Sequence, residues 1–257
     1  MDKQAGSGSQ WLKLADGYRM TFDWHTHTTY SHGKGSIEDN VRAAQERGLK
    51  EIAITDHGPG HLTYGLSMKK IREMRAEIDR LKAVYPDVNI LLGVEANTMR
   101  PAPYLDVKPE DEALFDIIIG GYHFGLLHAG MVSNWFSDKL GLFRSETSGL
   151  RVKNTAMILD ALYQRKLQVL THPGDKGPFD MEDIARACAD TGTLLEINMK
   201  HAHLTVAEIR QAAKYDVKFI IGSDAHVPEA VGSYRGSLAR ALEAGLDPCR
   251  IANIEKI

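Results

Sequence analysis

The sequence is poor in cysteine and contains neither a long apolar run nor a strong excess of charge of one sign. Its two cysteines, Cys188 and Cys249, lie far apart and lack CxxC spacing. This spacing excludes a disulfide framework and a zinc site built from thiolates. The amino-terminal residues lack the apolar segment of a secretory signal, and no apolar run approaches the length that crosses a bilayer. We therefore expect a cytoplasmic protein.

The charge balance gives no sign of a polyanionic partner. The formal net charge is -3, so bulk charge favours neither long nucleic acid nor a membrane surface. A composition of 43% hydrophobic and 25% charged residues is typical of a globular protein. We expect residues 1–18 to form a flexible leader. Residues 19–257 are expected to form a single domain, because this length is ordinary for one α/β barrel.

Short apolar segments alternate with amphipathic helical segments along the chain. The apolar segments predict strands at residues 19–25, 51–55, 89–94, 115–121, 167–170, 193–198 and 218–222. Helices are expected between them, and N-cap residues predict where several begin: Ser36, Ser67, Asp180 and Thr205. Further helices are expected at residues 153–166 and 234–244. Strands that alternate with helices form a parallel sheet, so the pattern predicts a closed or nearly closed α/β barrel.

One long connection interrupts this pattern. Residues 124–150 follow the fourth predicted strand and contain Trp135, Phe136, Phe143 and Arg144. Connections of this length are more often functional than not. A loop that covers a substrate and an insertion packed on the barrel rim are both compatible with the sequence.

Three histidines, His25, His27 and His32, fall within eight residues after the first predicted strand. Side chains alternate along a strand, so His25 and His27 point to the same face. Two imidazoles on one face, with a third from the following loop, suit a transition metal. The alternative, that these histidines are ordinary surface residues, is weakened by their clustering.

Other residues with metal-binding side chains also follow predicted strands. Barrel enzymes build their active sites at the carboxyl ends of the strands. The residues at or just beyond these ends are His25, His27, His32, Asp56, His57, Glu95, His123, His172, Asp224 and His226. Random placement would scatter histidines over helices and both rims, so the sequence predicts one metal site at this face.

The motifs at these positions resemble those of a known family. They are HxH(x4)H from His25, followed by TDHGP, GVEAN, GGYH, THPG and GSDAH. In this order they resemble the PHP (polymerase and histidinol phosphatase) family, and in particular its stand-alone metal-dependent phosphoesterases. The resemblance covers nearly the whole predicted domain. It implies a distorted seven-stranded (β/α) barrel, in agreement with the predicted strands.

The resemblance also implies a site for up to three divalent transition metal ions. It assigns His25, His27, Glu95 and Asp224 to one ion. Glu95 is shared with a second ion, which His123 and His172 also bind. The third is assigned to His32, His57 and His226. Histidine and carboxylate ligands accommodate zinc, manganese and iron alike.

The function implied is hydrolysis of a phosphate ester by a metal-bound hydroxide. Adjacent divalent ions lower the pKa of bound water and neutralise charge that develops at phosphorus. A small phosphomonoester is favoured, and histidinol phosphate is one substrate that the resemblance implies. The alternatives are a nuclease or phosphodiesterase acting on nucleotides or short oligonucleotides, and a non-catalytic metal-binding regulatory module. The sequence does not give the oligomeric state.

Substrate contacts are less clear from the sequence. Candidate contacts on loops are His61, Arg144, Lys176, Lys200 and His201, and each is otherwise a surface residue. His203, which forms a second HxH pair with His201, has the same two interpretations. Asp56 is expected either to orient His57 or a water molecule beside the metal, or to serve as a turn residue.

Overall fold

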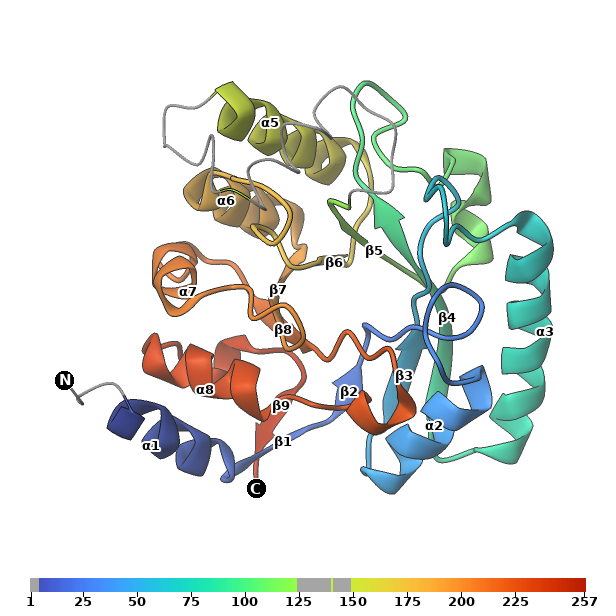
Figure 1. Ribbon diagram of the computed structural model, residues 1–257, viewed down its shortest axis with the longest axis horizontal. Coiled ribbons are helices and arrows are strands. Elements are labelled where there is room, and N and C mark those ends of the chain that lie inside the picture. The colour runs from blue at the N-terminus through green and yellow to red at the C-terminus, as the bar shows by residue number, and fades with distance from the viewer. Residues whose placement is uncertain (1–4, 124–139, 141–148) are drawn as a thin grey trace.

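The protein is a single α/β barrel whose strands are all parallel (Figure 1). The structure, a computed structural model, describes residues 5–123, 140 and 149–257. The seven strands lie in sequence order around the sheet: β2 (Phe22–Asp23), β3 (Glu51–Ile54), β4 (Asn89–Asn97), β5 (Ile117–Gly121), β6 (Val169–Leu170), β7 (Leu194–Asn198) and β8 (Phe219–Gly222). The predicted α/β barrel with seven strands is confirmed.

The first and last strands, β2 and β8, approach each other at both ends and nearly close the barrel. Beyond their carboxyl ends, Thr26 and Ala225 form a parallel bridge, and the His27 N–H donates to the Ala225 carbonyl at 2.8 Å. At the amino end of β2, beside Ile221 of β8, the Asn253 side-chain amide donates to the Phe22 carbonyl at 2.8 Å and to that of Ile221 at 2.7 Å. One buried asparagine thus joins the two strands.

Helices surround the barrel (Figure 1). Among the described residues, the α-helices that follow β2 include α2 (Ile37–Glu46), α3 (Met68–Val84), α5 (Gly149–Gln164), α6 (Met181–Thr191), α7 (Val206–Ala212) and α8 (Arg235–Glu243). The predicted N-caps are confirmed: Ser36 and Thr205 form capping boxes, and the side chains of Ser67 and Asp180 accept main-chain N–H groups. Short 3-10 turns complete the connections: η1 (Pro109–Leu114), η2 (Pro228–Ala230) and η3 (Pro248–Arg250). No helix among the described residues is both long and apolar enough to span a membrane.

The amino-terminal segment differs from the expectation. The strand predicted at residues 19–25 is divided into β1 (Tyr18–Met20) and β2, and β1 leaves the barrel to pair antiparallel with β9 (Ile254–Lys256). The segment expected to be a leader contains α1 (Ala5–Ala15), which lies beside α8 (Figure 1). Ala15 is buried in the core, which gives α1 an apolar contact. The division of the chain into leader and domain stays a prediction.

The apolar residues form two groups. The larger lies between the strands and the helices and includes Ile52, Leu92 and Ile118. The smaller group consists of alternate residues of the strands: Ala53, Ile117, Ile119, Val169 and Ile220. Because side chains alternate along a strand, residues two positions apart point to the same face. Gly222 therefore follows Ile220 on the inward face of β8, and Glu196 follows Leu194 on the inward face of β7. The inward-facing residues therefore change from apolar to polar toward the carboxyl ends.

Candidate metal centre

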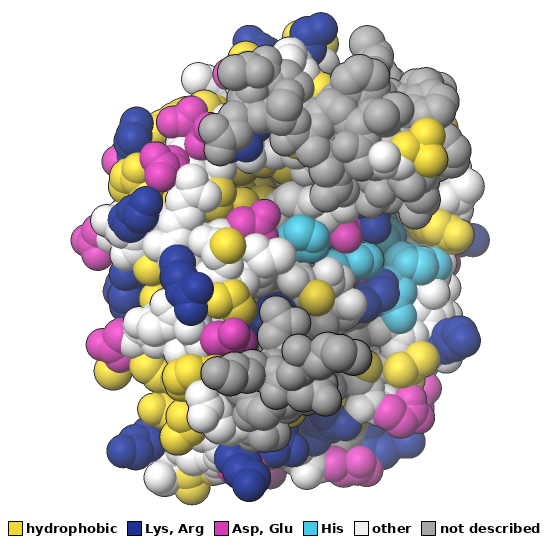
Figure 2. All heavy atoms as spheres, turned by 60° about the vertical axis from the view of Figure 1, so that its left-hand side comes forward, with side chains coloured by type: hydrophobic (Ala, Val, Ile, Leu, Met, Phe, Trp, Pro, Cys, Tyr) yellow, Lys and Arg dark blue, Asp and Glu magenta, His cyan; other side chains and the backbone are white. Residues whose placement is uncertain are grey.

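The structure brings all nine residues of the expected metal set together at the carboxyl ends of the strands. They fall into four overlapping groups in which the potential ligand atoms lie within 4.8 Å of one another: His27, His32, His57 and His226; His25, His172 and Asp224; His25, His27 and Glu95; and His57, Glu95 and His123. Figure 2 shows histidine side chains gathered on one face of the molecule, beside lysine or arginine side chains.

The first expected ion would lie between His25, His27, Glu95 and Asp224. The Nε2 atom of His25 is 3.2 Å from Glu95 Oε1 and 3.7 Å from Asp224 Oδ1. The Nε2 atom of His27 is 3.5 Å from Glu95 Oε2 and 3.4 Å from Asp224 Oδ1. Ligands about 2.1 Å from a tetrahedral ion lie roughly 3.4 Å apart. The four distances are close to this value, with Oε1 of Glu95 facing His25 and Oε2 facing His27. The assignment of these four side chains to one ion stays a prediction.

Glu95 lies at the centre of the whole cluster. Its Oε1 atom is also 3.2 Å from His123 Nε2 and 3.0 Å from His172 Nε2. Its Oε2 atom is 3.2 Å from His57 Nδ1. One carboxylate offers two oxygens, so Glu95 has the position of a ligand shared between neighbouring ions.

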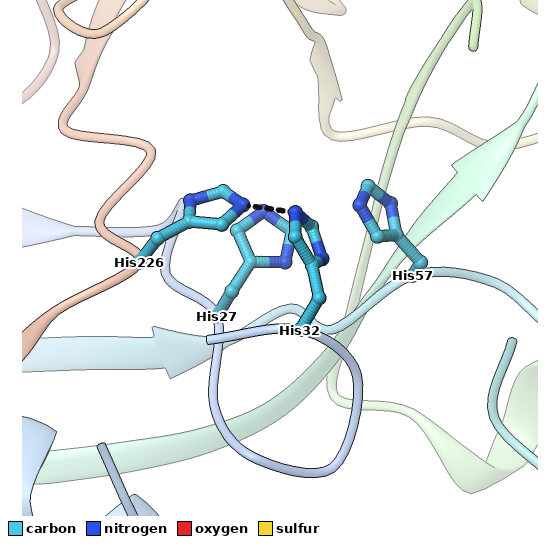
Figure 3. A group of neighbouring side chains, drawn as sticks. All are labelled: His27, His32, His57 and His226. Atoms are coloured by element: carbon cyan, nitrogen blue, oxygen red, sulfur yellow. Dashed lines mark hydrogen bonds between the residues drawn. The ribbon is translucent and has the colours of Figure 1, made fainter. Parts of the chain in front are cut away.

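The remaining histidines form a compact group (Figure 3). The Nε2 atoms of His32 and His226 are 2.6 Å apart, and the rings of His32 and His57 stack at 4.8 Å. The ring of His27 lies 4.3 Å from that of His226. The structure therefore places His27 beside the group assigned to the third ion as well as beside the first. The division of the nine residues among three ions stays a prediction.

The charges in the cluster suit metal binding. Burial would raise the pKa of Glu95, but His123 and His25 outweigh it and hold that pKa well below its usual value. The pKa of Asp224 is also well below its usual value, because His25 and His201 outweigh the effect of burial. Burial, followed by the neighbouring histidines, lowers the pKa of His32 to about 3. Although burial opposes them, Glu196, Glu95 and Asp224 raise the pKa of His25 well above its usual value. Metals bind ionised carboxylates and neutral imidazoles, so an ion at Nε2 of His25 would release a proton from that ring.

Several imidazole nitrogens in the cluster have no hydrogen-bond partner among the described residues. They are Nε2 of His25, both ring nitrogens of His27, Nδ1 of His32, Nδ1 of His57 and Nε2 of His123. Unpartnered buried polar atoms are costly in a folded protein. Divalent ions would satisfy these nitrogens, so the side chains present fit the metal site that the sequence implies.

Two of the histidines are held by side chains outside the expected metal set. Nδ1 of His25 lies 2.6 Å from Oε1 of Glu196 on β7. Nδ1 of His123 lies 2.8 Å from Oδ1 of Asn97, whose side-chain amide donates to Asp106 Oδ2 at 2.6 Å. A hydrogen bond at one ring nitrogen sets the orientation and tautomer of the ring, and leaves the other nitrogen for a metal.

Asp56 supports a loop. Its Oδ1 atom accepts the Thr28 main-chain N–H at 2.8 Å, and its Oδ2 atom accepts the Thr28 hydroxyl at 2.5 Å. The Ser31 hydroxyl also donates to Asp56. These bonds fix the segment that leads to His32. These contacts are of the kind expected for a turn residue, and the alternative role, in which Asp56 orients His57 or a water molecule beside the metal, stays a prediction.

A cavity of about 470 Å³ opens above the cluster. Four of the five candidate substrate contacts line it: His61, Lys176, Lys200 and His201. Arg144 lies outside the described residues. His203 lies apart, with its Nδ1 atom 3.5 Å from Glu208 Oε2.

Two histidines that line the cavity, His61 and His201, differ in charge. The ring of His61 stacks on His57 at 4.9 Å, and burial together with the nearby histidines lowers the pKa of His61 to about 4. Although burial opposes it, Asp175 and Asp224 raise the pKa of His201 to about 9. His61 is therefore uncharged at neutral pH, whereas His201 is protonated and pairs with Asp175 and Asp224.

Some supporting residues were not identified from the sequence. Asn97 carries no signal beyond its place in the GVEAN motif, and Glu196 lies within the strand predicted at residues 193–198. The available signal for Glu196 was its spacing from Leu194. The two residues are two positions apart on β7, so their side chains point to the same, inward face. Tyr64, whose ring stacks on His32 at 4.6 Å and lines the cavity, carried no signal in the sequence.

Comparison with family models and with proteins of known sequence gives a consistent result. The family model described as PHP domain matches residues 23–198, and the one described as PHP-associated matches residues 207–246. The chain is 28% identical over 232 residues to a "Probable phosphatase" of Shewanella sp. (strain MR-4), covering 84% of this chain and 81% of the relative. It is 29% identical over 252 residues to one of Thermoanaerobacter sp. (strain X514), covering 92% and 91%.

Solved structures share the fold. The histidinol phosphate phosphatase of Lactococcus lactis, in a complex with zinc, L-histidinol and phosphate, matches with a TM-score of 0.64 and 21% identity, covering 89% of this chain and 95% of that one. A histidinol phosphatase structure from Listeria monocytogenes matches with a TM-score of 0.63 and 16% identity, covering 83% and 98%.

Proposed function

The chain belongs to the PHP domain family and is a metal-dependent phosphoesterase, and from this premise we propose that it hydrolyses a small phosphate monoester at a centre for up to three divalent ions. The observation that carries the proposal is the position of Glu95, whose carboxylate lies within 3.5 Å of five imidazoles. Zinc, manganese and iron all suit such ligands. Zinc is the first candidate, since the Lactococcus lactis structure contains it.

We assign the nine side chains to three ions as the resemblance implies. His25, His27, Glu95 and Asp224 would hold the first ion. Glu95, His123 and His172 would hold the second, and His32, His57 and His226 the third. Ions in such a site activate water near neutral pH and neutralise the charge of a phosphate group during displacement.

Residues of the chain itself would bind and orient the substrate. Lys200 lies on the cavity wall with its Nζ atom 3.7 Å from Asp224 Oδ1, and Lys176 lines the same cavity. Their ammonium groups, together with a protonated His201, are suited to donate hydrogen bonds to phosphate oxygens. Because a metal-activated hydroxide would attack phosphorus directly, the proposal needs no serine or cysteine nucleophile.

The shape of the site favours a small substrate. A cavity of about 470 Å³ lies within the range of small-molecule sites. The lining also includes the rings of His61 and Tyr64, which would contact the alcohol part of the ester. Histidinol phosphate is the first candidate, because the Lactococcus lactis enzyme is named for it.

The test is metal analysis followed by phosphate release. Purified protein would be reconstituted with zinc, manganese or iron and offered histidinol phosphate, an aryl phosphate, nucleoside monophosphates and a short oligonucleotide. We expect two or three metals per chain, preference for a monoester, and loss of turnover in His123→Ala and Asp224→Ala. Cleavage of the oligonucleotide in preference to every monoester would instead support the nuclease. Fewer than two metals with no turnover would support a non-catalytic metal-binding module.

A further inference from the structure

A carboxylate outside the expected metal set is buried directly against His25. Glu196 on β7 is fully buried, with 0% of its surface exposed. Its Oε1 atom lies 2.6 Å from His25 Nδ1. Its Oε2 atom accepts the main-chain N–H of His172 at 2.8 Å and the side-chain amide of Asn198 at 3.0 Å. One side chain thus joins the ends of three strands, β2, β6 and β7.

All three partners of Glu196 are hydrogen-bond donors toward it. The His172 main chain and the Asn198 amide each offer an N–H, and His25 donates when Nδ1 carries the proton. A neutral His25 with its proton on Nδ1 presents the lone pair of Nε2 to the cluster. That Nε2 atom lies 3.2 Å from Glu95 and 3.7 Å from Asp224. Glu196 therefore selects the tautomer that a metal ligand requires.

The neighbouring strand leaves space for this carboxylate at one position. A Cβ atom added to Gly222 on β8 would lie 1.9 Å from Glu196 Oε1 and 2.9 Å from Glu196 Cδ. It would lie 3.1 Å from His25 Cβ, a tight contact that a small shift relieves. Glycine within a strand often marks a close approach of another group. Any side chain at position 222 would displace the Glu196 carboxylate from His25.

We propose that Glu196 and Gly222 form a positioning pair for the metal centre. Glu196 fixes the ring of His25 and the main chain of His172, and Gly222 provides the space in which the Glu196 carboxylate lies. The inference rests on the proposed metal site and adds to it two residues that bind no ion themselves. A carboxylate that holds a metal-binding histidine in this way is worth about 10–100-fold in metal affinity.

The first test is the zinc affinity of Glu196→Gln, measured by competition with a chromophoric chelator. Glutamine has nearly the same shape, but its side chain has only one oxygen. The three donors around Glu196 are bound by two oxygens. The NH2 group of glutamine would then face another N–H. We expect zinc to bind about 10–100-fold more weakly than to the wild type. The exposed Glu110→Gln is the matched control and should bind zinc as the wild type does.

The second test asks whether a side chain at position 222 acts by displacing the Glu196 carboxylate or by disturbing the packing in general. Gly222→Ala should weaken zinc binding although Glu196 is still present. In a Glu196→Ala background, the same change should add nothing, since the carboxylate that it displaces is gone. Gly149→Ala is the control, because a Cβ atom there would meet nothing within 4 Å. Where Glu196→Ala fails to fold, Glu196→Gln provides the background.

Melting of the metal-free proteins completes the test. A lower zinc affinity with a melting temperature close to that of the wild type supports the positioning role. Unchanged zinc affinity with a lowered melting temperature would overturn it, because Glu196 would then be only structural. If Gly222→Ala weakened zinc binding equally in the wild type and in the Glu196→Ala background, the pairing of Glu196 with Gly222 would be overturned. Since zinc binding needs no substrate, a wild type that binds zinc but hydrolyses nothing would contradict the proposed function and leave this result intact.

Discussion

The two ends of the barrel interior both contain buried side chains but differ in chemistry. Toward the amino ends of the strands, the inward side chains are apolar, as with Ile119 and Ile220. Toward the carboxyl ends, the side chains are carboxylates and imidazoles, and Glu95 at 1% and Glu196 at 0% are exposed no more than the apolar residues. The apolar layer is stabilised by packing alone. The polar layer buries charges, which need a partner of opposite sign.

Glu95→Gln is expected to have the largest effect on the polar layer. Glu95 is the carboxylate within 3.5 Å of five imidazoles, so its loss removes the negative charge at the centre of the polar layer. We expect lower metal content and a fall in kcat/KM beyond the roughly 100-fold seen for supporting residues. Metal analysis and steady-state kinetics measure both. Full metal content with normal turnover would show that Glu95 does not bind metal.

Removal of the metals should lower the stability of the folded protein, because the charges of the polar layer would lose the ions that compensate them. A ligand that binds only the folded state stabilises it by about 4 kcal/mol at a thousand times its Kd. We therefore expect chelator-treated protein to melt at a lower temperature and the melting temperature to rise with added zinc. Differential scanning calorimetry tests this. A melting temperature that does not depend on zinc would mean that the charges of this layer compensate one another without ions.

The same contrast explains how much could be predicted from the sequence. Strand positions and helix starts depend on local patterns, and the N-caps Ser36 and Thr205 were predicted correctly. The histidines were placed at strand ends because each motif directly follows an apolar segment. The barrel then brings those ends together, so residues as distant in sequence as His27 and His226 meet.

Contacts that depend on the register between strands could not be predicted in this way. The pairing of β1 with β9 divides the first predicted strand, yet it joins residues at opposite ends of the chain. The contact of Glu196 with His25 spans 171 positions, and it requires a glycine on a third strand. Neither contact leaves a periodic signal in the sequence.

A smaller effect is expected from Asn97→Ala. This change removes the oxygen that lies 2.8 Å from His123 Nδ1, while His123 itself remains. The ring can then rotate or adopt the other tautomer, so we expect a loss of about tenfold in kcat/KM or metal affinity. Asn89→Ala, at the exposed start of the same strand β4, is the control. Equal effects of the two changes would show that Asn97 does not orient His123.

The smallest effect should come from the apolar layer. Ile119→Val removes one methylene group from a fully buried side chain on β5, so we expect the free energy of unfolding to fall by about 0.5–1.5 kcal/mol. Urea denaturation measures this loss, which should be equal with and without zinc, because Ile119 holds no charge that an ion compensates. Zinc affinity and kcat should stay at the wild-type values. If zinc affinity fell as well, the packing beneath the polar layer would be setting the positions of the metal-binding side chains, and the two layers would have to be treated as one unit.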